Sequence, residues 1–156
     1  MSKPRVRIRA MEVGDLPAVL KIEEKTNPSP WSERSFRSEL SNRDAHYFVV
    51  ECGEEVVGFG GYWAILDEAH ITTVAIAPPF QGQGLGRKLV EHLLTDASQR
   101  GITCATLEVR SSNTRAQTLY ERLGFVATGM RKRYYADTRE DAVVMWLHGL
   151  RAEKAG

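Results

Sequence analysis

The chain has 156 residues, of which 42% are hydrophobic and 26% are charged, and its formal net charge is +1. These values are typical of a globular domain with a substantial core, and they argue against disorder and against general binding of nucleic acid by charge. The two cysteines form no C-x-x-C pair and have no histidine at metal-ligand spacing. We therefore expect one domain over residues 1–156, with neither a metal site nor a disulfide framework.

The opening residues, MSKPRVRIRAME, lack the apolar segment of a signal peptide. No run approaches the ~18 apolar residues that a membrane span requires. Together with the unpaired cysteines, these features predict a cytoplasmic protein without membrane association. The basic cluster at 131–133 lies beside a predicted strand and is typical of a solvated face.

The first 65 residues predict one strand, two helices and a hairpin. Alternating residues in RVRIRA predict an edge strand over Val6–Ala10. Asp15 is placed as the N-cap of a first helix, and a second helix follows Ser32 after the loop KTNPSPW. Two β-rich runs on either side of residues 52–54 predict a hairpin.

Strands and helices alternate in the rest of the chain. The strand in EAHITTVAIAPP ends at Pro78, because proline cannot donate to a ladder, and apolar spacing from Leu85 predicts a helix that ends near Gly101. The apolar run TCATLEV predicts a central strand covered on both faces. Asn113 caps the next helix, which ends before Gly124. Two final strands in FVATGMRKRYY and DAVVMWLHGL complete a mixed α/β fold.

A glycine-rich loop connects the strand that ends at the two prolines to the helix that follows. A helix start presents unpaired backbone N–H groups and the positive end of the helix dipole, which together attract an anion. Glycines lack the Cβ atoms that would keep a pyrophosphate away from the main chain. The loop therefore predicts an anion site at its three glycines, which are Gly82, Gly84 and Gly86.

Three other interpretations of this loop are weaker. A P-loop needs G-x-x-x-x-G-K-[ST], but the fifth residue after Gly82 is Arg87. A dinucleotide-binding loop needs G-x-G-x-x-G after a first strand, whereas this loop follows the fourth strand and Arg87 again replaces a glycine. Only Glu108, at a later strand end, supports that second interpretation. A purely structural turn would not need three glycines.

The pattern Q-x-x-G-x-G, at Gln81, Gly84 and Gly86, resembles the acetyl-CoA motif of the GNAT acetyltransferase superfamily. The resemblance extends over nearly the whole chain through PWSERSF, LDEAHITTVAI, LEVRSSNTRAQTLYERLGF and RKRYYADTREDAVVM. It is closest to the RimI-type ribosomal-protein alanine N-acetyltransferases. The resemblance implies a single GNAT-like domain, with a mixed, mostly antiparallel sheet of about seven strands and about four helices.

The same resemblance implies that acetyl-CoA donates an acetyl group to a protein α-amine, in particular to the N-terminal alanine of a small-subunit ribosomal protein. In the family, the strand before the glycine loop bulges and leaves N–H groups for the pantetheine arm, while the loop binds the pyrophosphate. For Asn113, a plain helix cap is an equally good interpretation. The implied cofactor-binding residues are Val74, Ala75, Ile76, Gln81, Gly82, Gln83, Gly84, Leu85, Gly86, Arg87 and Asn113.

The resemblance also assigns two catalytic residues. Glu108 is the implied general base, acting directly or through water, and the alternative is a structural carboxylate at a strand end. Tyr120 is the implied general acid for the departing thiolate, and the alternative is a core tyrosine. It follows Asn113 by two helical turns, so both residues project from one face.

The acceptor is expected between the loop NPSPWS and the segment RYYADTRED. Trp31, Tyr134 and Tyr135 are the implied walls of a slot for a small first residue, although Trp31 fits a core position equally well. Acidic residues nearby could attract a basic peptide, namely Glu33, Asp137 and Glu140. Two alternative functions stay open: an acetyltransferase for other chain ends or small amines, and an acetyl-CoA-binding module without turnover.

Overall fold

The computed structural model describes residues 5–150. These residues form two compact units, one made by the chain up to Trp63 together with Thr72–Leu93, the other by Ala64–Ile71 and the chain from Leu94 on. The division falls inside the strands β3 (Glu55–Ile65) and β4 (Glu68–Ile76) and inside the helix α3 (Leu85–Gln99). The domain predicted over 1–156 stays a prediction, and residues 1–4 and 151–156 lie outside the described part.

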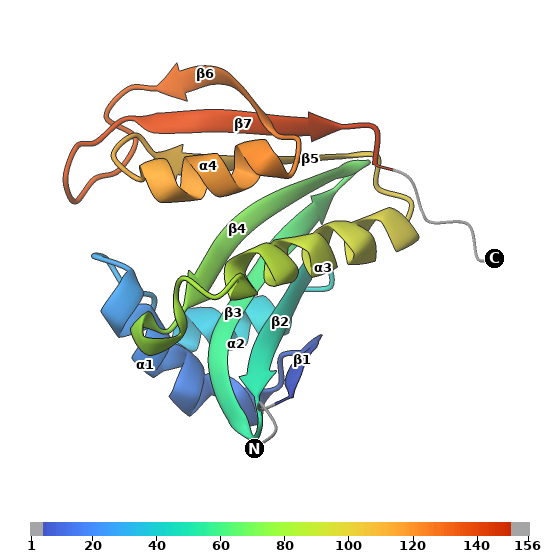
Figure 1. The fold of residues 1–156 in the computed structure, drawn as a ribbon, viewed down its shortest axis with the longest axis vertical. Helices are drawn as coiled ribbons and strands as arrows, with labels where there is room; N and C mark the ends of the chain where they lie inside the picture. The colour runs from blue at the N-terminus through green and yellow to red at the C-terminus, as the bar shows by residue number, and fades with distance from the viewer. Residues whose placement is uncertain (1–4, 151–156) are drawn as a thin grey trace. The chain divides into compact units, whose positions relative to one another are not determined.

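The order of elements agrees with the one that the sequence predicts (Figure 1). The elements are β1 (Val6–Ala10), α1 (Leu16–Thr26), α2 (Glu33–Leu40), β2 (Ala45–Cys52), β3 (Glu55–Ile65), β4 (Glu68–Ile76), α3 (Leu85–Gln99), β5 (Cys104–Arg110), α4 (Thr114–Arg122), β6 (Val126–Arg131) and β7 (Ala142–His148). Short 3-10 turns lie at Val13–Asp15 and Pro78–Phe80.

The strands are hydrogen-bonded in the order β1-β2-β3-β4-β5-β7-β6. The pairs β1–β2, β2–β3, β5–β7 and β6–β7 are antiparallel, and β4–β5 is parallel. The mixed, mostly antiparallel sheet of seven strands with four helices is thereby confirmed, as is the edge position of β1. The insertion of β7 between β5 and β6 was not predicted.

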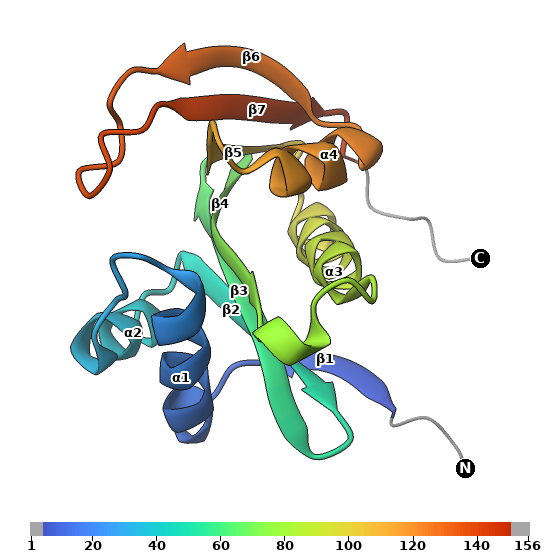
Figure 2. The ribbon, with the colours of Figure 1, turned by 60° about the vertical axis from the view of Figure 1, so that its left-hand side comes forward.

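In the first unit, helices cover both faces of β2 and β3. Figure 2 shows α1 and α2 on one side of these strands and the start of α3 on the other. The side under α1 and α2 is a continuous apolar core that includes Leu16, Val19, Ile22, Phe36, Val49 and Phe59. On the other side, α3 comes so close to β3 that a Cβ at Gly60 would lie 3.1 Å from the Leu89 side chain. Glycine therefore allows this close packing.

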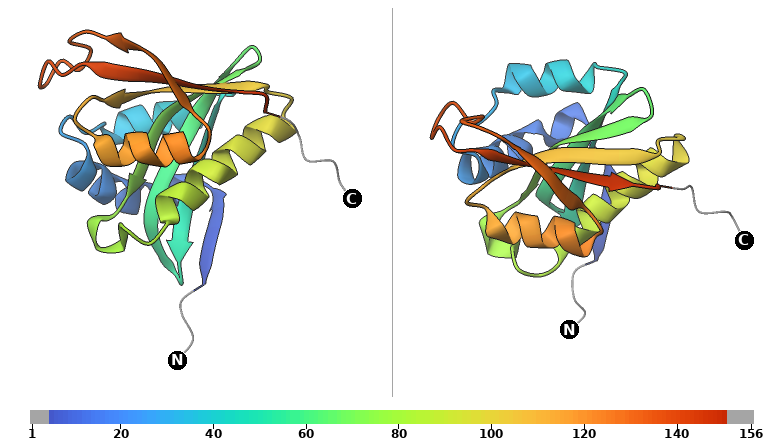
Figure 3. Two further views of the ribbon diagram at one scale, coloured as in Figure 1. Left: turned by 45° about the horizontal axis from the view of Figure 1, so that its top comes forward. Right: turned by 90° about the horizontal axis from the view of Figure 1, so that it is seen from above.

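In the second unit, α4 lies beside the strands β5, β7 and β6 (Figure 3). Leu107 on β5 and Met145 on β7 are directly paired and buried, and Phe125 after α4 is buried as well. The predicted central strand is thus confirmed as a buried one. Strand β6 is exposed along its whole length. None of the described helices is long and apolar enough to cross a membrane.

Two local predictions differ from the structure. Asp15 does precede α1, but its carboxylate caps no N–H of that helix. It accepts hydrogen bonds from Arg9 at 2.7 and 2.8 Å and from the backbone of Glu12 at 2.8 Å, because the turn before α1 brings these donors closer. The strand predicted through Tyr135 ends at Arg131, since Arg133 has a positive φ of 50° that breaks the extended backbone.

Candidate active site

The glycine loop has the geometry of an anion cradle. Gly82 and Gly84 have φ values of 80° and 81°, in the left-handed region that only glycine adopts without strain. A Cβ at Gly84 would have no neighbour within 4 Å, so the loop is open to a ligand. Lys88 N–H donates to the Gly84 carbonyl at 3.2 Å. Within the described residues, no N–H from residues 82–87 donates a backbone hydrogen bond outside the helix, so these donors are available.

The end of β4 is fixed by hydrogen bonds to its neighbours. The Gln81 amide Nε2 donates to the Ile76 carbonyl at 2.9 Å, and the Ala77 N–H donates to Val57 at 2.8 Å. Gln81 therefore has a positioning role in this structure: it ties the loop to the end of β4. The bulge and the pantetheine contacts implied at Val74–Ile76 stay predictions.

Asn113 is the N-cap of α4, as predicted. Its side-chain oxygen accepts from the Ala116 N–H at 3.1 Å. The Gln117 amide donates to the carbonyls of Arg110 at 3.1 Å and Ser111 at 3.0 Å, which fixes the turn before the helix. The cap interpretation is confirmed, and a cofactor contact of Asn113 stays a prediction.

Glu108 lies on β5 opposite Val144 of β7, with its side chain 27% exposed. Its Oε1 atom lies 3.2 Å from Nε of Arg131, on β6. The carboxylate is therefore neither deeply buried nor at a frayed end. It is held in place by an ion pair and remains accessible to solvent.

Tyr120 lies on the buried face of α4 and is 7% exposed. Its ring packs edge-on against Phe125, with centroids 5.6 Å apart. Burial, reinforced by the nearby Tyr135, raises the pKa of the Tyr120 phenol above its usual value. Within residues 5–150 no group forms a hydrogen bond with its hydroxyl. The phenol thus stays protonated at neutral pH, as a proton donor must.

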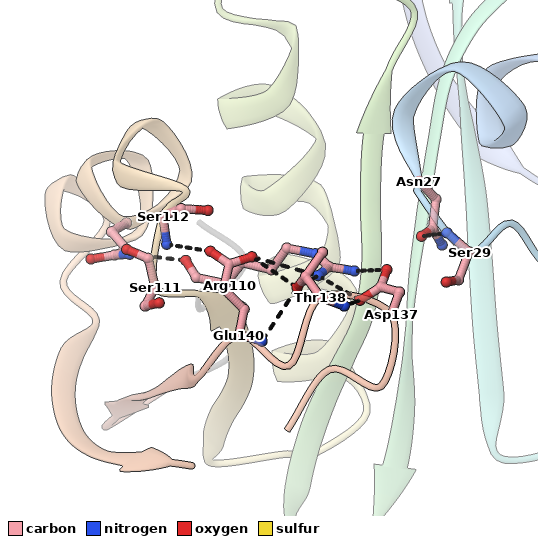
Figure 4. A network of polar contacts seen from close by, with 9 residues as sticks. Asn27, Ser29, Arg110, Ser111, Ser112, Asp137, Thr138 and Glu140 are labelled. Atoms are coloured by element: carbon pink, nitrogen blue, oxygen red, sulfur yellow. Dashed lines mark hydrogen bonds and ion pairs between the residues drawn. The ribbon is translucent and has the colours of Figure 1, made fainter. Parts of the chain in front are cut away.

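Arg110, at the end of β5, organises the loop before β7 (Figure 4). It forms a bidentate pair with Asp137 at 3.0 and 2.8 Å, and NH1 lies 3.6 Å from a carboxylate oxygen of Glu140. Its guanidinium carbon lies 4.0 Å from the centre of the Tyr135 ring. These contacts fix the loop, and the single positive charge of Arg110 compensates one of the two negative charges that we expected to attract a basic peptide.

The two predicted tyrosines lie side by side in that loop. The rings of Tyr134 and Tyr135 pack edge-on with centroids 5.1 Å apart. Arg131 lies 5.7 Å from the centre of the Tyr134 ring while it pairs with Glu108. Desolvation raises the pKa of Tyr135 to about 12. The second unit thus brings both tyrosines into one cluster with Glu108.

Trp31 lines a small pocket in the first unit. The pocket has a volume of about 50 Å³ and is lined by Glu23, Asn27, Trp31, Phe36, Thr72 and Thr73. Trp31 packs against Phe36 with ring centroids 5.5 Å apart. It is half-buried and packs against the core rather than lying fully inside it, and its role as a wall of the acceptor slot stays a prediction.

A family model supplies the decisive comparison. The model of the acetyltransferase (GNAT) family matches residues 16–125. The chain belongs to the GNAT acetyltransferase family. As a GNAT protein it is an N-acetyltransferase that takes its acetyl group from acetyl-CoA. The matched stretch contains the glycine loop, Glu108 and Tyr120.

Several GNAT proteins are similar to this chain over nearly their full length. The ribosomal protein bS18-alanine N-acetyltransferase of Escherichia coli strain K12 is 41% identical over 142 residues, covering 90% of this chain and 95% of that protein. The enzyme of the same name from Salmonella typhimurium strain LT2 is 38% identical over 144 residues, with coverage of 90% and 95%. The crystal structure of the ribosomal-protein-S18-alanine N-acetyltransferase from Escherichia coli matches with a TM-score of 0.86, 38% identity and 97% coverage of both chains.

Sequence reasoning missed three residues that make specific contacts within their own units. Arg131 belongs to a basic cluster that the sequence assigns to a solvated face, yet it pairs with Glu108. Arg110 ends a strand without any motif that marks it. Glu23 occupies a buried helical position, where only the absence of an apolar residue in the stripe could have drawn attention to it. Within residues 5–150 no cluster of His, Cys, Asp or Glu could hold a metal ion.

Proposed function

We propose that this GNAT enzyme transfers the acetyl group of acetyl-CoA to the N-terminal alanine of ribosomal protein bS18. The observation that carries the proposal is the 41% identity, over 90% of the chain, to an enzyme named for that substrate. The proposal places the protein in the cytoplasm, where ribosomal proteins are made. It assigns no metal to the reaction: an ammonium acceptor first loses a proton to solvent, Glu108 takes the second proton from the attacking nitrogen, and Tyr120 gives one to the thiolate.

We assign cofactor binding mainly to the main chain. The N–H groups of the glycine loop from Gly82 to Arg87 bind the diphosphate, with the dipole of α3 behind them. The exposed Arg87 side chain, whose Nε lies 3.9 Å from Glu91, adds positive charge. The backbone N–H groups of Val74, Ala75 and Ile76 hold the pantetheine arm. Asn113, at the start of α4, makes a further contact with the cofactor.

The reaction requires a neutral amine, because an ammonium group has no electron pair for attack on the thioester carbonyl. Glu108 takes the proton from the amine, directly or through one water molecule. An α-amine with a pKa of about 8 is already partly neutral at physiological pH, whereas a lysine near 10.4 is not. A carboxylate base therefore suits an N-terminal acceptor better than a lysine side chain.

Collapse of the tetrahedral intermediate expels the CoA thiolate, which needs a proton. Tyr120 supplies it, since its buried phenol stays protonated throughout the neutral range. We assign Trp31 of the first unit and Tyr134 and Tyr135 of the second to binding of the acceptor's first residue, because rigid aromatic side chains suit a small apolar group.

The test is a transfer assay with radiolabelled acetyl-CoA. We expect acetylation of peptides with the bS18 N-terminus and of other peptides that begin with alanine, and slower acetylation of matched peptides that begin with serine or methionine. A peptide with a blocked N-terminus and an internal lysine is the control. Label confined to that lysine contradicts the proposal, equal labelling of all N-termini indicates broad specificity, and CoA binding without transfer indicates a binding module.

A further inference from the structure

Glu23 is a buried carboxylate that opens into the pocket beside Trp31. It lies on α1 and is only 3% exposed. Its Oε2 atom accepts two hydrogen bonds, from the backbone N–H of Trp31 at 2.9 Å and from the side-chain amide of Asn27 at 3.0 Å. Both donors belong to the loop between α1 and α2, so Glu23 holds that loop on the end of α1.

The charge of Glu23 is not compensated by any cation in the described chain. The ion pairs among residues 5–150 include neither oxygen of this carboxylate, and both hydrogen bonds go to Oε2. A buried carboxylate without a cationic partner is costly, and proteins retain one where it serves a site. Glu23 lines the pocket and both of its hydrogen bonds go to Oε2, so Oε1 is the oxygen left to accept from a ligand.

The pocket has the size and chemistry for an ammonium group. Its volume of about 50 Å³ exceeds the ~10–15 Å³ that one water molecule needs, and leaves room for an α-carbon with a methyl group. The hydroxyl of Thr72 is already engaged, 3.0 Å from Tyr47 Oη and 3.3 Å from the Gly61 carbonyl. The walls at Trp31 and Phe36 are aromatic. A small cation with an apolar neighbour fits this combination.

The position of the pocket along β4 connects it with the reaction. Thr72 and Thr73, which form one wall, directly precede Val74–Ile76, the stretch proposed to hold the pantetheine arm. Consecutive residues of a strand advance by about 3.3 Å, so this wall of the pocket directly adjoins the stretch proposed to hold the pantetheine arm, which carries the acetyl group. All of these residues belong to the first unit.

We propose that Glu23 Oε1 binds the α-ammonium group of the acceptor chain before that group is deprotonated. This inference rests on the proposed function and adds a substrate-binding residue to it. Glu23 then has two tasks: Oε2 positions the loop that carries Trp31, and Oε1 selects a chain whose first residue carries a free, charged amine. A neutral group of the same shape leaves the buried charge unpaired and binds less well.

The test compares two peptides that differ only in this amine. One begins with alanine, and the other carries a propionyl group in its place. Each is titrated by calorimetry at pH 6.5 into the full-length protein saturated with CoA, so that no transfer occurs and the α-amine is charged. We expect the wild-type protein to bind the alanine peptide about tenfold more tightly, which corresponds to about 1.4 kcal/mol.

Glu23→Gln separates the two tasks of this residue. The glutamine carbonyl oxygen still accepts from Trp31 and Asn27, so the loop stays in place, while its NH₂ group faces the pocket and repels an ammonium group. The preference for the amine should fall to about twofold or less. The matched control is Glu24→Gln, which changes the adjacent, exposed carboxylate and should retain the full preference.

Two results overturn the inference. One is a wild-type protein that binds both peptides equally, which needs no variant and is independent of folding. The other is a folded Glu23→Gln variant that retains the tenfold preference. If either result is found while the wild-type protein acetylates alanine peptides, only the proposed role of Glu23 is refuted. If the wild-type protein transfers no acetyl group, the proposed function itself is refuted.

Discussion

Glu108 and Arg131 pair across an intervening strand. Glu108 lies on β5 and Arg131 on β6, and β7 separates the two strands, yet Oε1 and Nε are 3.2 Å apart. The long arginine side chain therefore reaches over β7 to orient the carboxylate. This contact places the proposed general base on a rigid part of the sheet rather than on a loop.

Glu108→Gln should abolish the base without disturbing the strand, because glutamine has nearly the same shape. We expect kcat for an alanine peptide to fall by about 10²–10⁴-fold, the usual contribution of a general base, with CoA affinity unchanged. Steady-state kinetics and calorimetry measure the two quantities. Glu121→Gln, on the exposed face of α4, is the control and should keep wild-type activity. A Glu108→Gln enzyme with normal kcat would move the base to a bound water.

Tyr120→Phe should separate chemistry from packing. Phenylalanine keeps the edge-on contact with Phe125, so the free energy of unfolding should change by less than about 1 kcal/mol. The missing hydroxyl should lower kcat by about 10²–10⁴-fold. Denaturant titration and turnover of the same preparation give both values. Unchanged turnover would leave Tyr120 as a core residue only.

Alkaline pH should destabilise the fold through its buried tyrosines. Burial raises the pKa of Tyr47 and of Tyr120, and it raises that of Tyr135 to about 12. The pKa of tyrosine in the unfolded chain is about 10. Below this pH all three phenols are neutral in the folded and in the unfolded protein, so their contribution to stability is fully present. Above it the unfolded chain ionises first, and stability falls by about 1.4 kcal/mol per pH unit for each such tyrosine.

Urea unfolding at pH 8, 10 and 11 measures this effect. Stability should fall slightly between the first two values, by about 0.4 kcal/mol for each such tyrosine, and more steeply to the third, and Tyr47→Phe or Tyr120→Phe should make the fall shallower. A variant with the same pH dependence as the wild type would show that its tyrosine ionises normally in the folded protein.

Gly84→Ala should weaken cofactor binding through the backbone alone. The residue has a φ of 81° and an added Cβ would touch nothing, so the only penalty is about 1 kcal/mol of left-handed strain. A loop that relaxes to avoid this strain misaligns its N–H groups, and the Kd for CoA should rise roughly fivefold. Gly14→Ala is the control, since Gly14 is equally open but has no positive φ. Equal CoA affinity in both variants would show that the loop conformation is unimportant.

Arg110→Ala should loosen the loop that carries the two tyrosines. The arginine side chain is 20% exposed and makes a bidentate pair with Asp137, so its loss should lower the free energy of unfolding by about 1–3 kcal/mol. The KM for the peptide should rise roughly tenfold while the Kd for CoA stays constant. Arg37→Ala removes a half-exposed pair with Glu33 and should cost less than about 1 kcal/mol. A peptide KM that does not change would remove this loop from acceptor binding.

Local signals in the chain were sufficient for the elements and for the cofactor motif. Period-two alternation defined β1, a capping side chain marked Asn113, and closely spaced glycines marked the anion loop. These signals depend on a few neighbouring residues, which is why they can be read without knowledge of the fold. The assignment of Glu108 and Tyr120 came from family resemblance instead, and no spacing argument replaces it.

Contacts between distant residues could not be predicted. Asp15 pairs with Arg9 instead of capping α1, and this pairing depends on how β1 is oriented relative to the turn that follows it. The partners of Arg131 and Arg110 lie on other strands or loops, and β7 could have paired on either side of β6. The only local signal for Glu23 is a charged residue among the buried positions of α1, and its importance comes from the loop that folds over it.

The open donors at the start of α3 belong to peptide bonds, which every sequence possesses. Replacing Gln83 or Arg87 can change the charge around the proposed diphosphate site, but among single substitutions only one to proline deletes one of those backbone N–H groups. A competitive inhibitor that engages them would therefore be difficult for the protein to escape by exchanging side chains, and resistance would have to come from altering the course of the loop itself.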